Sequence, residues 1–263
     1  MNAGDLYKAG KLQEAIDAQL QEVKKAAADH GKRLFLFELL AFAGDLDRAA
    51  KQIDVVNYGE LERDSAVLTY RKLIDAERLR RRLFSEGLEP KFFQDPPPHV
   101  KQRLEAVNLL RDQRPKEAAE LLAQANAAVL NVKGELNGKP FQSLRDCDDL
   151  FASVLEVMAQ GAYYWVPLDQ VVSILASAPK FPRDLIWRPI KLEMASATGD
   201  AFLPALYPGS HEHSDPLVRL GRTTDWKETD GGPVLGVGLR TFLADDDPTT
   251  LLEWRQMQLT ALD

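Results

Sequence analysis

The first half of the chain carries its apolar residues at the three- and four-residue spacing of an amphipathic helix. Two such stripes are formed by Leu12, Ile16, Leu20 and Val23, and by Leu36, Leu39, Leu40 and Ala43. Few Gly or Pro residues interrupt the pattern between residues 3 and 128. The pattern therefore predicts an all-helical first half.

A short phrase with Gly, Leu and Ala at fixed places occurs at residues 10–16 and again at residues 44–50. The 34-residue spacing is that of the tetratricopeptide repeat, in which Gly turns the chain between two antiparallel helices. The next step falls on Arg78, where no turn signal exists and a longer helix is expected. A third, degenerate copy follows at residues 113–119. Stacked helix pairs form grooves, which indicates binding rather than chemistry.

After residue 131 the residues Gly, Pro, Trp and Tyr become frequent and the pattern changes. One amphipathic helix is predicted over residues 146–160, followed mostly by strands. Alternation at 190–194, a turn at 198–200 and a return segment at 201–207 predict a hairpin. A second hairpin is predicted from residues 234–243 and 251–259, around a turn at 245–248.

We therefore expect a multidomain α and α+β protein. A tetratricopeptide-like helical repeat domain is predicted at residues 1–132, and a mixed, largely antiparallel α+β domain at residues 140–263.

Composition narrows the classes of function. The 33 Lys and Arg residues against 40 Asp and Glu give the 263-residue chain a formal charge of −7, which disfavours a general nucleic-acid binder. The single cysteine, Cys147, excludes an internal disulfide framework and agrees with a reducing compartment. Charged residues interrupt the first twenty positions, and no apolar run approaches the roughly 20 residues that span a bilayer. We expect a cytoplasmic protein without a nucleic-acid or membrane partner.

The densest group of possible metal ligands is His211, Glu212, His213 and Asp215. On an extended segment His211 and His213 share one side and, with Asp215, could serve a metal-dependent hydrolase. A solvated loop is the favoured interpretation, because the group directly follows the turn-forming residues 207–210 and the chain has no Gly-x-Ser-x-Gly elbow. We expect no catalytic residue, metal or cofactor, and keep the hydrolase as the alternative.

Three further features have both a functional and a structural interpretation. The arginine-rich residues 71–82 could face a phosphate backbone or an acidic helix, but the acidic residues among them favour a solvated helical face. The Gly-rich residues 232–238 lack a nucleotide-loop pattern and favour a bulged strand. The aromatic residues Tyr163, Tyr164, Trp165 and Trp187 are either interface anchors or, as strands favour, core.

Four phrases of the second half resemble the ImpE/TagJ family of accessory proteins of bacterial type VI secretion systems. They occupy residues 161–167, 183–189, 207–210 and 220–226. Their signature residues here are Tyr163, Tyr164, Trp165, Pro167, Trp187, Pro189, Tyr207, Pro208, Gly209 and Trp226. The resemblance extends to the repeat phrase at residues 10–16 and to residues 34–40, so it spans nearly the whole chain.

The resemblance implies a helical-repeat domain before an α+β domain and no known catalytic residues. It also implies two partners, the small contractile-sheath subunit (TssB-like) and, in some systems, the AAA+ unfoldase ClpV. The hypothesis is a non-enzymatic adaptor that takes an amphipathic helix into a groove of its repeat domain. From periodicity, the candidate groove residues are Phe35, Glu38, Leu39 and Phe42.

Overall fold

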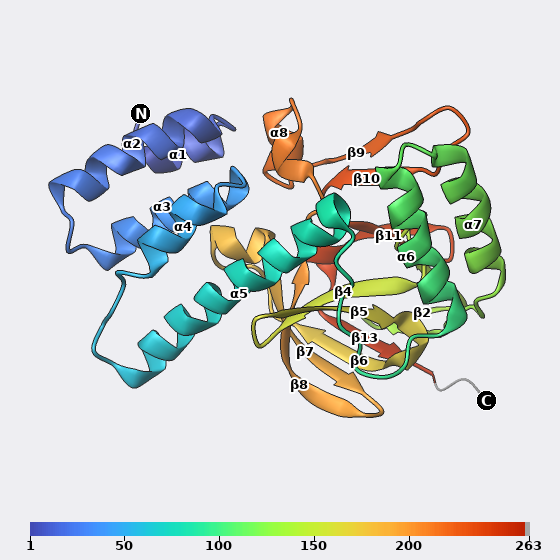
Figure 1. Cartoon of the computed structure of the whole chain (residues 1–263). Coiled ribbons are helices and arrows are strands. Elements are labelled where there is room, and N and C mark those ends of the chain that lie inside the picture. Colours follow the sequence, from blue (N-terminus) through green and yellow to red (C-terminus); the bar gives the residue numbers. More distant parts are fainter. Residues whose placement is uncertain (261–263) are drawn as a thin grey trace.

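The computed structural model describes residues 1–260, in which long helices precede the strands (Figure 1). The helices are α1 (Ala3–Lys8), α2 (Leu12–Lys25), α3 (His30–Phe42), α4 (Leu46–Ile53), α5 (Leu61–Glu86), α6 (Pro98–Arg111), α7 (Pro115–Ala127) and the short α8 (Pro216–Arg219). The strands are β1 (Gly134–Leu136), β2 (Lys139–Phe141), β3 (Leu144–Asp146), β4 (Val154–Ala159), β5 (Ala162–Pro167), β6 (Val171–Ala176), β7 (Trp187–Met194), β8 (Ala197–Pro204), β9 (Thr224–Lys227), β10 (Leu235–Gly238), β11 (Thr241–Ala244), β12 (Asp247–Thr250) and β13 (Gln256–Leu259).

Helix–turn–helix pairs occur at the three predicted places. Gly10 joins α1 to α2, Gly44 joins α3 to α4, and Gln113 joins α6 to α7. All three turn residues have left-handed backbones, with φ of 79°, 76° and 58°, respectively. The predicted helical first half and the longer helix around Arg78 are confirmed, the latter by the 26-residue α5. Tetratricopeptide-like stacking of the pairs stays a prediction.

Replacing Gly44 with Ala should lower the free energy of unfolding by about 3 kcal/mol, through left-handed strain and overpacking. A Cβ atom at this turn would lie 2.0 Å from Cδ2 of His211. Gly59 is a matched control, because it has a similar φ of 69° and nothing within 4 Å of the same position. Urea denaturation should show a loss of only about 1 kcal/mol for Gly59→Ala. Equal losses for the two variants would contradict the His211 contact.

Eight strands form one sheet in the order β2-β1-β13-β6-β7-β8-β4-β5, and β12-β11-β3 and β10-β9 form two smaller sheets. Every pairing between these strands is antiparallel, which confirms the predicted largely antiparallel α+β arrangement. The first predicted hairpin is β7–β8, but its turn lies at residues 195–196, because residues 198–200 continue β8.

The second predicted hairpin is wrong in its partners. The turn at Asp245 joins the short strands β11 and β12, whereas β10 pairs with β9 and β13 pairs with β1 and β6. Leu251, at the start of the predicted return strand, begins a 3₁₀ turn instead.

The predicted helix at residues 146–160 is also wrong. This segment contains the end of β3, a turn and β4. The carboxylate of Asp146 accepts the N–H of Asp148, and the carboxylate of Asp148 accepts those of Leu150 and Phe151. Aspartates that bond nearby amides favour turns over helix, which explains the interruption.

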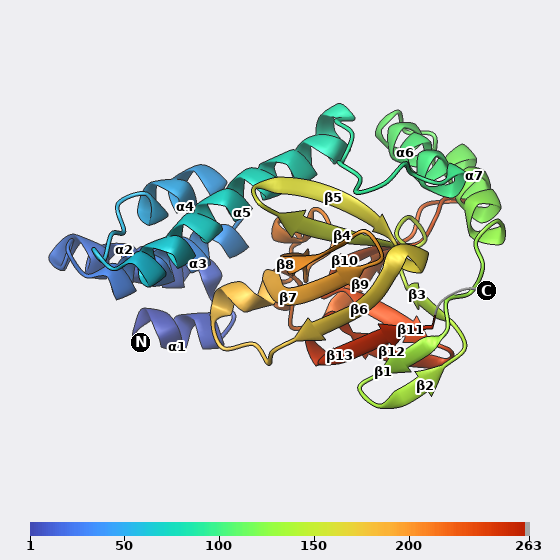
Figure 2. The same cartoon turned by 90° about the horizontal axis from the view of Figure 1, so that it is seen from below.

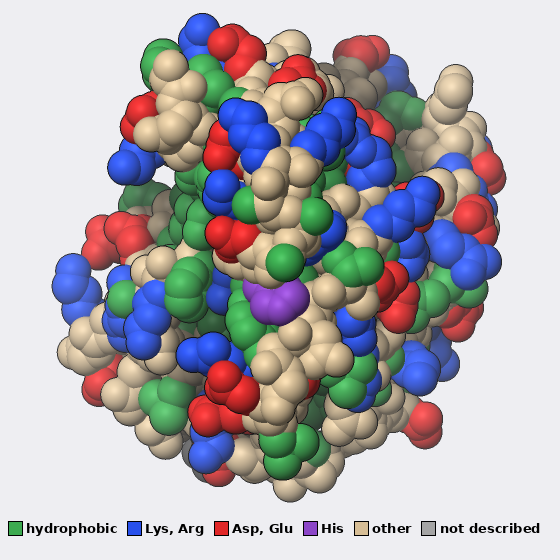
Figure 3. Space-filling view, turned by 90° about the vertical axis from the view of Figure 1, so that its left-hand side faces the viewer, with side chains coloured by type: hydrophobic (Ala, Val, Ile, Leu, Met, Phe, Trp, Pro, Cys, Tyr) green, Lys and Arg blue, Asp and Glu red, His purple; other side chains and the backbone are tan. Residues whose placement is uncertain are grey.

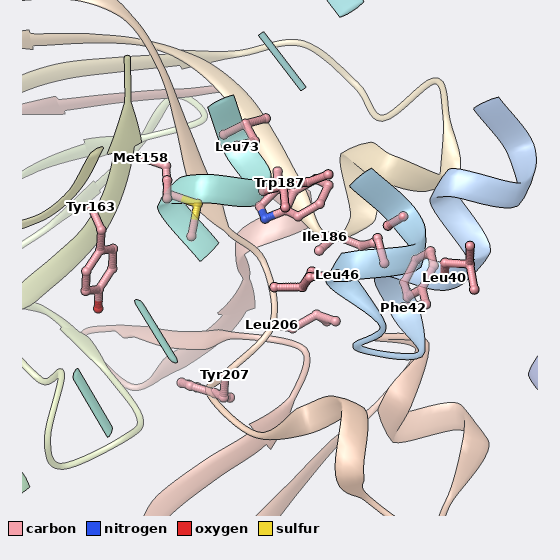
Figure 4. Close-up of a cluster of buried hydrophobic side chains, with 14 of the residues drawn as sticks. Leu40, Phe42, Leu46, Leu73, Met158, Tyr163, Ile186, Trp187, Leu206 and Tyr207 are labelled. Carbon is pink, nitrogen blue, oxygen red and sulfur yellow. The ribbon is translucent and has the colours of Figure 1, made fainter. Parts of the chain in front are cut away.

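One hydrophobic cluster joins the helices to the strands. Its buried members include Leu40, Phe42 and Leu46 from the first helices, Leu73 from α5, and Met158, Trp187 and Tyr207 from the second half (Figure 4). Phe37 of α3 stacks on Trp187 of β7, with ring centroids 6.1 Å apart. Figure 2 shows α5 running along β4 and β5, with α1–α4 around its first half and α6 and α7 beyond its other end.

The core interpretation of the aromatic residues is confirmed for three of the four. Tyr163, Trp165 and Trp187 are buried, whereas Tyr164 is half-buried and stacks on Phe93. Between residues 1 and 260, none of the helices has both the length and the apolar character needed to cross a membrane.

Candidate protein-binding groove and its support

A groove of about 590 Å³ opens between α3, α5 and the 3₁₀ turn at Pro182–Leu185. Its lining is mostly apolar and aromatic, and consists of Gly31, Leu34, Phe35, Glu38, Tyr58, Arg63, Ala66, Val67, Tyr70, Phe181 and Arg183. Figure 3 shows the end of the molecule formed by the first helices, where hydrophobic side chains are visible in a recess among charged ones. Concave, largely apolar surfaces with a few polar groups are the usual form of binding sites.

Arg183 links the 3₁₀ turn on one side of the groove to α3 and α5 on the other. Its guanidinium lies over the ring of Phe181 at 4.0 Å and over that of Tyr70 at 4.8 Å. It also donates a hydrogen bond to the carboxylate of Glu38, whose side chain is 5% exposed. Burial raises the pKa of Glu38, and the positive charge of Arg183 opposes that rise. Residues from both halves of the chain thus build this groove.

The structure separates the four candidate groove residues. Phe35 and Glu38 line the groove, whereas Leu39 and Phe42 are 0% and 1% exposed and lie in the core. Phe42 packs against Tyr7 of α1. Phe181, Arg183 and Tyr70 were not predicted, although Arg183 lies in one of the phrases that resemble the family.

A buried ion network lies farther along α5, between this helix and the sheet. Arg80 of α5 donates two hydrogen bonds, of 2.7 and 2.8 Å, to the carboxylate of Glu156 on β4. Arg240 donates to Glu156 and also to Asp146 at 2.8 Å. All four side chains are at most 6% exposed. The network therefore fastens α5 to the sheet.

Several signature residues pack around this network. The Tyr163 hydroxyl donates to Glu156, and Nε1 of Trp165 donates to Tyr163 at 2.6 Å. The Tyr207 hydroxyl donates to Asp146 at 2.6 Å. Trp226 lies 6.0 Å from the ring of Tyr207. The remaining signature residues are Pro167 and Tyr164 in β5, Trp187 and Pro189 in β7, and Pro208 and Gly209 in the turn after β8.

The prediction of a solvated arginine face on α5 needs correction. Arg80 is only 5% exposed. Its guanidinium donates hydrogen bonds to the carboxylate of Glu156 and to the carbonyl of Leu206, which replace its contacts with water. Arg78 pairs with Asp47 and Asp75, Arg82 pairs with Glu86, and Arg81 donates to the Gly44 carbonyl. The run thus makes contacts within the chain.

The residues of the alternative hydrolase face different neighbours. The His211 ring lies against Gly44, and burial lowers its pKa. Nε2 of His213 lies 3.3 Å from a carboxylate oxygen of Asp225, and Asp215 caps α8 through the N–H of Leu217. Within residues 1–260 there is no group of three or more His, Cys, Asp or Glu placed to hold a metal ion.

The stability of the protein should depend on pH through Asp148, which lies beside the ion network. Burial, together with the charge of Asp146, raises its pKa from 3.8 to about 7. Between about pH 4 and 7 the folded state keeps a proton that the unfolded state has lost, so this contribution to stability falls as pH rises, by at most about 1.4 kcal/mol per pH unit. Urea denaturation across this window should show wild type losing stability relative to Asp148→Asn. A difference in stability between the two proteins that does not change with pH would contradict the raised pKa of Asp148.

Helix–turn–helix pairs fastened to an antiparallel sheet, with a largely apolar groove, make this an α+β protein with a candidate binding site. The sequence model of the ImpE protein family matches residues 138–258. The type VI secretion system accessory component TagJ of Pseudomonas aeruginosa is 36% identical over 266 residues, covering 100% of this chain and 92% of TagJ. The chain belongs to the ImpE/TagJ family. The crystal structure of protein VPA1032 from Vibrio parahaemolyticus has the same fold, with a TM-score of 0.89 at 22% identity over 98% of this chain and 97% of that one.

Proposed function

We propose that this protein is an accessory component of a type VI secretion system and acts there as a non-enzymatic adaptor. Full-length similarity to TagJ supports the secretion role. The groove between α3, α5 and Phe181 is the observation that supports binding, because it leaves an aromatic side chain 50% exposed beside an apolar floor. Single exposed apolar residues are ordinary, but a concave group of them marks an interaction surface.

The proposed occupant is an amphipathic helix of the small sheath subunit (TssB-like). Helix-in-groove recognition needs apolar anchors at helical spacing and a hydrophobic trough to receive them. Leu34, Phe35 and Val67 provide apolar surface in the trough, and Arg63 provides a charge beside it. Residues 1–132 are the proposed binding domain, and residues 140–263 support it and add Phe181 and Arg183 to the groove. ClpV is a second proposed partner, and the proposed place of action is the cytoplasm.

Titration calorimetry against the sheath subunit of the same organism tests the partner. The expected result is a micromolar dissociation constant for the intact subunit and no binding after its N-terminal helix is deleted. Two temperatures are needed, since apolar binding can have an enthalpy near zero at one of them. No heat with the intact subunit at either temperature would overturn the sheath subunit as partner. Equal binding of the deleted form would overturn the helix-in-groove mode.

A further inference from the structure

A second cavity, of about 280 Å³, lies at the other end of α5, and it shares no lining residue with the groove. Phe84 of α5, Leu110 of α6, Phe151 and Leu235 give it apolar walls. Pro208 and Gly209, from a signature phrase, form another side. These five segments, which are separate in the sequence, thus line one largely apolar space.

Two cationic side chains line this cavity, and neither forms an ion pair within the described part of the chain. Arg111 ends α6 and Lys227 ends β9. Within residues 1–260, neither cation has an acidic group within 4.0 Å. The guanidinium of Arg111 lies close to Gly87, where a Cβ atom would be 2.2 Å from Nη1.

The one acidic side chain of the lining is already satisfied. Asp148 is 2% exposed, and its carboxylate accepts the N–H groups of Leu150, Phe151 and Gly236. The uncompensated charge around the cavity is therefore positive, so an anionic group attached to an apolar one complements it.

We propose that this cavity binds the carboxy-terminal residue of a partner protein, with an apolar side chain inside and the terminal carboxylate beside Arg111 and Lys227. The cavity of about 280 Å³ is at the small end of the roughly 300–1,000 Å³ of ligand pockets, which suits a single side chain. Capture of a terminal carboxylate is an established mode of peptide recognition. The proposal does not depend on the sheath subunit or on the groove.

Titration of the full-length, ¹⁵N-labelled protein with N-acetyl-leucine tests this site by NMR. We expect saturable shifts of the amides of Phe151, Gly209 and Gly236, with a millimolar dissociation constant. N-acetyl-leucinamide, which lacks the carboxylate, should bind at least tenfold more weakly. The double variant Arg111→Gln/Lys227→Gln should also lose at least tenfold in affinity for N-acetyl-leucine.

The matched control is Lys24→Gln/Lys101→Gln, which removes two exposed cations from outside the cavity. It should bind N-acetyl-leucine as wild type does, and an equal loss would show attraction by net charge alone. Equal binding of the acid and the amide would overturn the role of the cations. If octanoate binds tenfold more tightly than N-acetyl-leucine, the occupant is a free aliphatic acid and the proposed peptide terminus is wrong. If none of the three amides shows saturable shifts, the cavity does not bind N-acetyl-leucine and the proposed site is wrong.

Discussion

Replacing Glu156 with Gln should lower the free energy of unfolding by about 3–5 kcal/mol, because a buried ion pair that loses one partner leaves uncompensated charge. Glu156 accepts hydrogen bonds from Arg80, Arg240 and Tyr163 and is 2% exposed. Burial alone would raise its pKa, but the two arginines outweigh that effect and the net shift of the pKa is downward. The amide of Gln is uncharged and adds N–H donors where the neighbours are already donors.

Urea denaturation followed by tryptophan fluorescence measures this loss. Trp165 reports on the network directly, since its Nε1 donates to Tyr163. The control is Glu86→Gln, which breaks the pair with Arg82, where both side chains are half exposed. That variant should lose less than about 1 kcal/mol, as exposed ion pairs do. A loss below 1 kcal/mol for Glu156→Gln would mean that the network does not fasten α5 to the sheet.

The helices were predictable because apolar residues recur in them at three- and four-residue spacing and few Gly or Pro residues interrupt them. The third helix pair was found although Gln113 stands where the repeat has Gly, and this residue still adopts φ of 58°. The strand β4 was not found, because Val154, Leu155, Val157 and Met158 are all buried and show no alternation. A continuous apolar stretch does not distinguish a buried strand from a helix.

The groove was predictable only in part, for a related reason. Residues 36–42 of α3 are all buried, so periodicity could not tell its groove-lining side from its core side. Arg183 reaches Glu38 from 145 positions away along the chain. Such contacts between distant segments leave no local signal in a single sequence. The same is true of the bond between Arg80 and Glu156, which made a buried arginine look like part of a solvated face.

Replacing Phe181 with Ala should weaken binding of the sheath-subunit helix at least tenfold, about 1.4 kcal/mol, if this helix occupies the groove. Phe181 suits the test because it is 50% exposed in the free protein, so its removal leaves no cavity in the core. Phe42, at 1% exposed, does not suit it, because its substitution would disturb folding.

Leu175 on β6 provides the matched control, being 47% exposed and absent from the groove lining. Leu175→Ala should leave the dissociation constant within twofold of wild type in the same calorimetric titration. Because aromatic side chains dominate interface hot spots, the contrast between the two variants should be large. If the intact sheath subunit binds and both variants bind it equally, the partner is correct and the groove between α3, α5 and Phe181 is not its site.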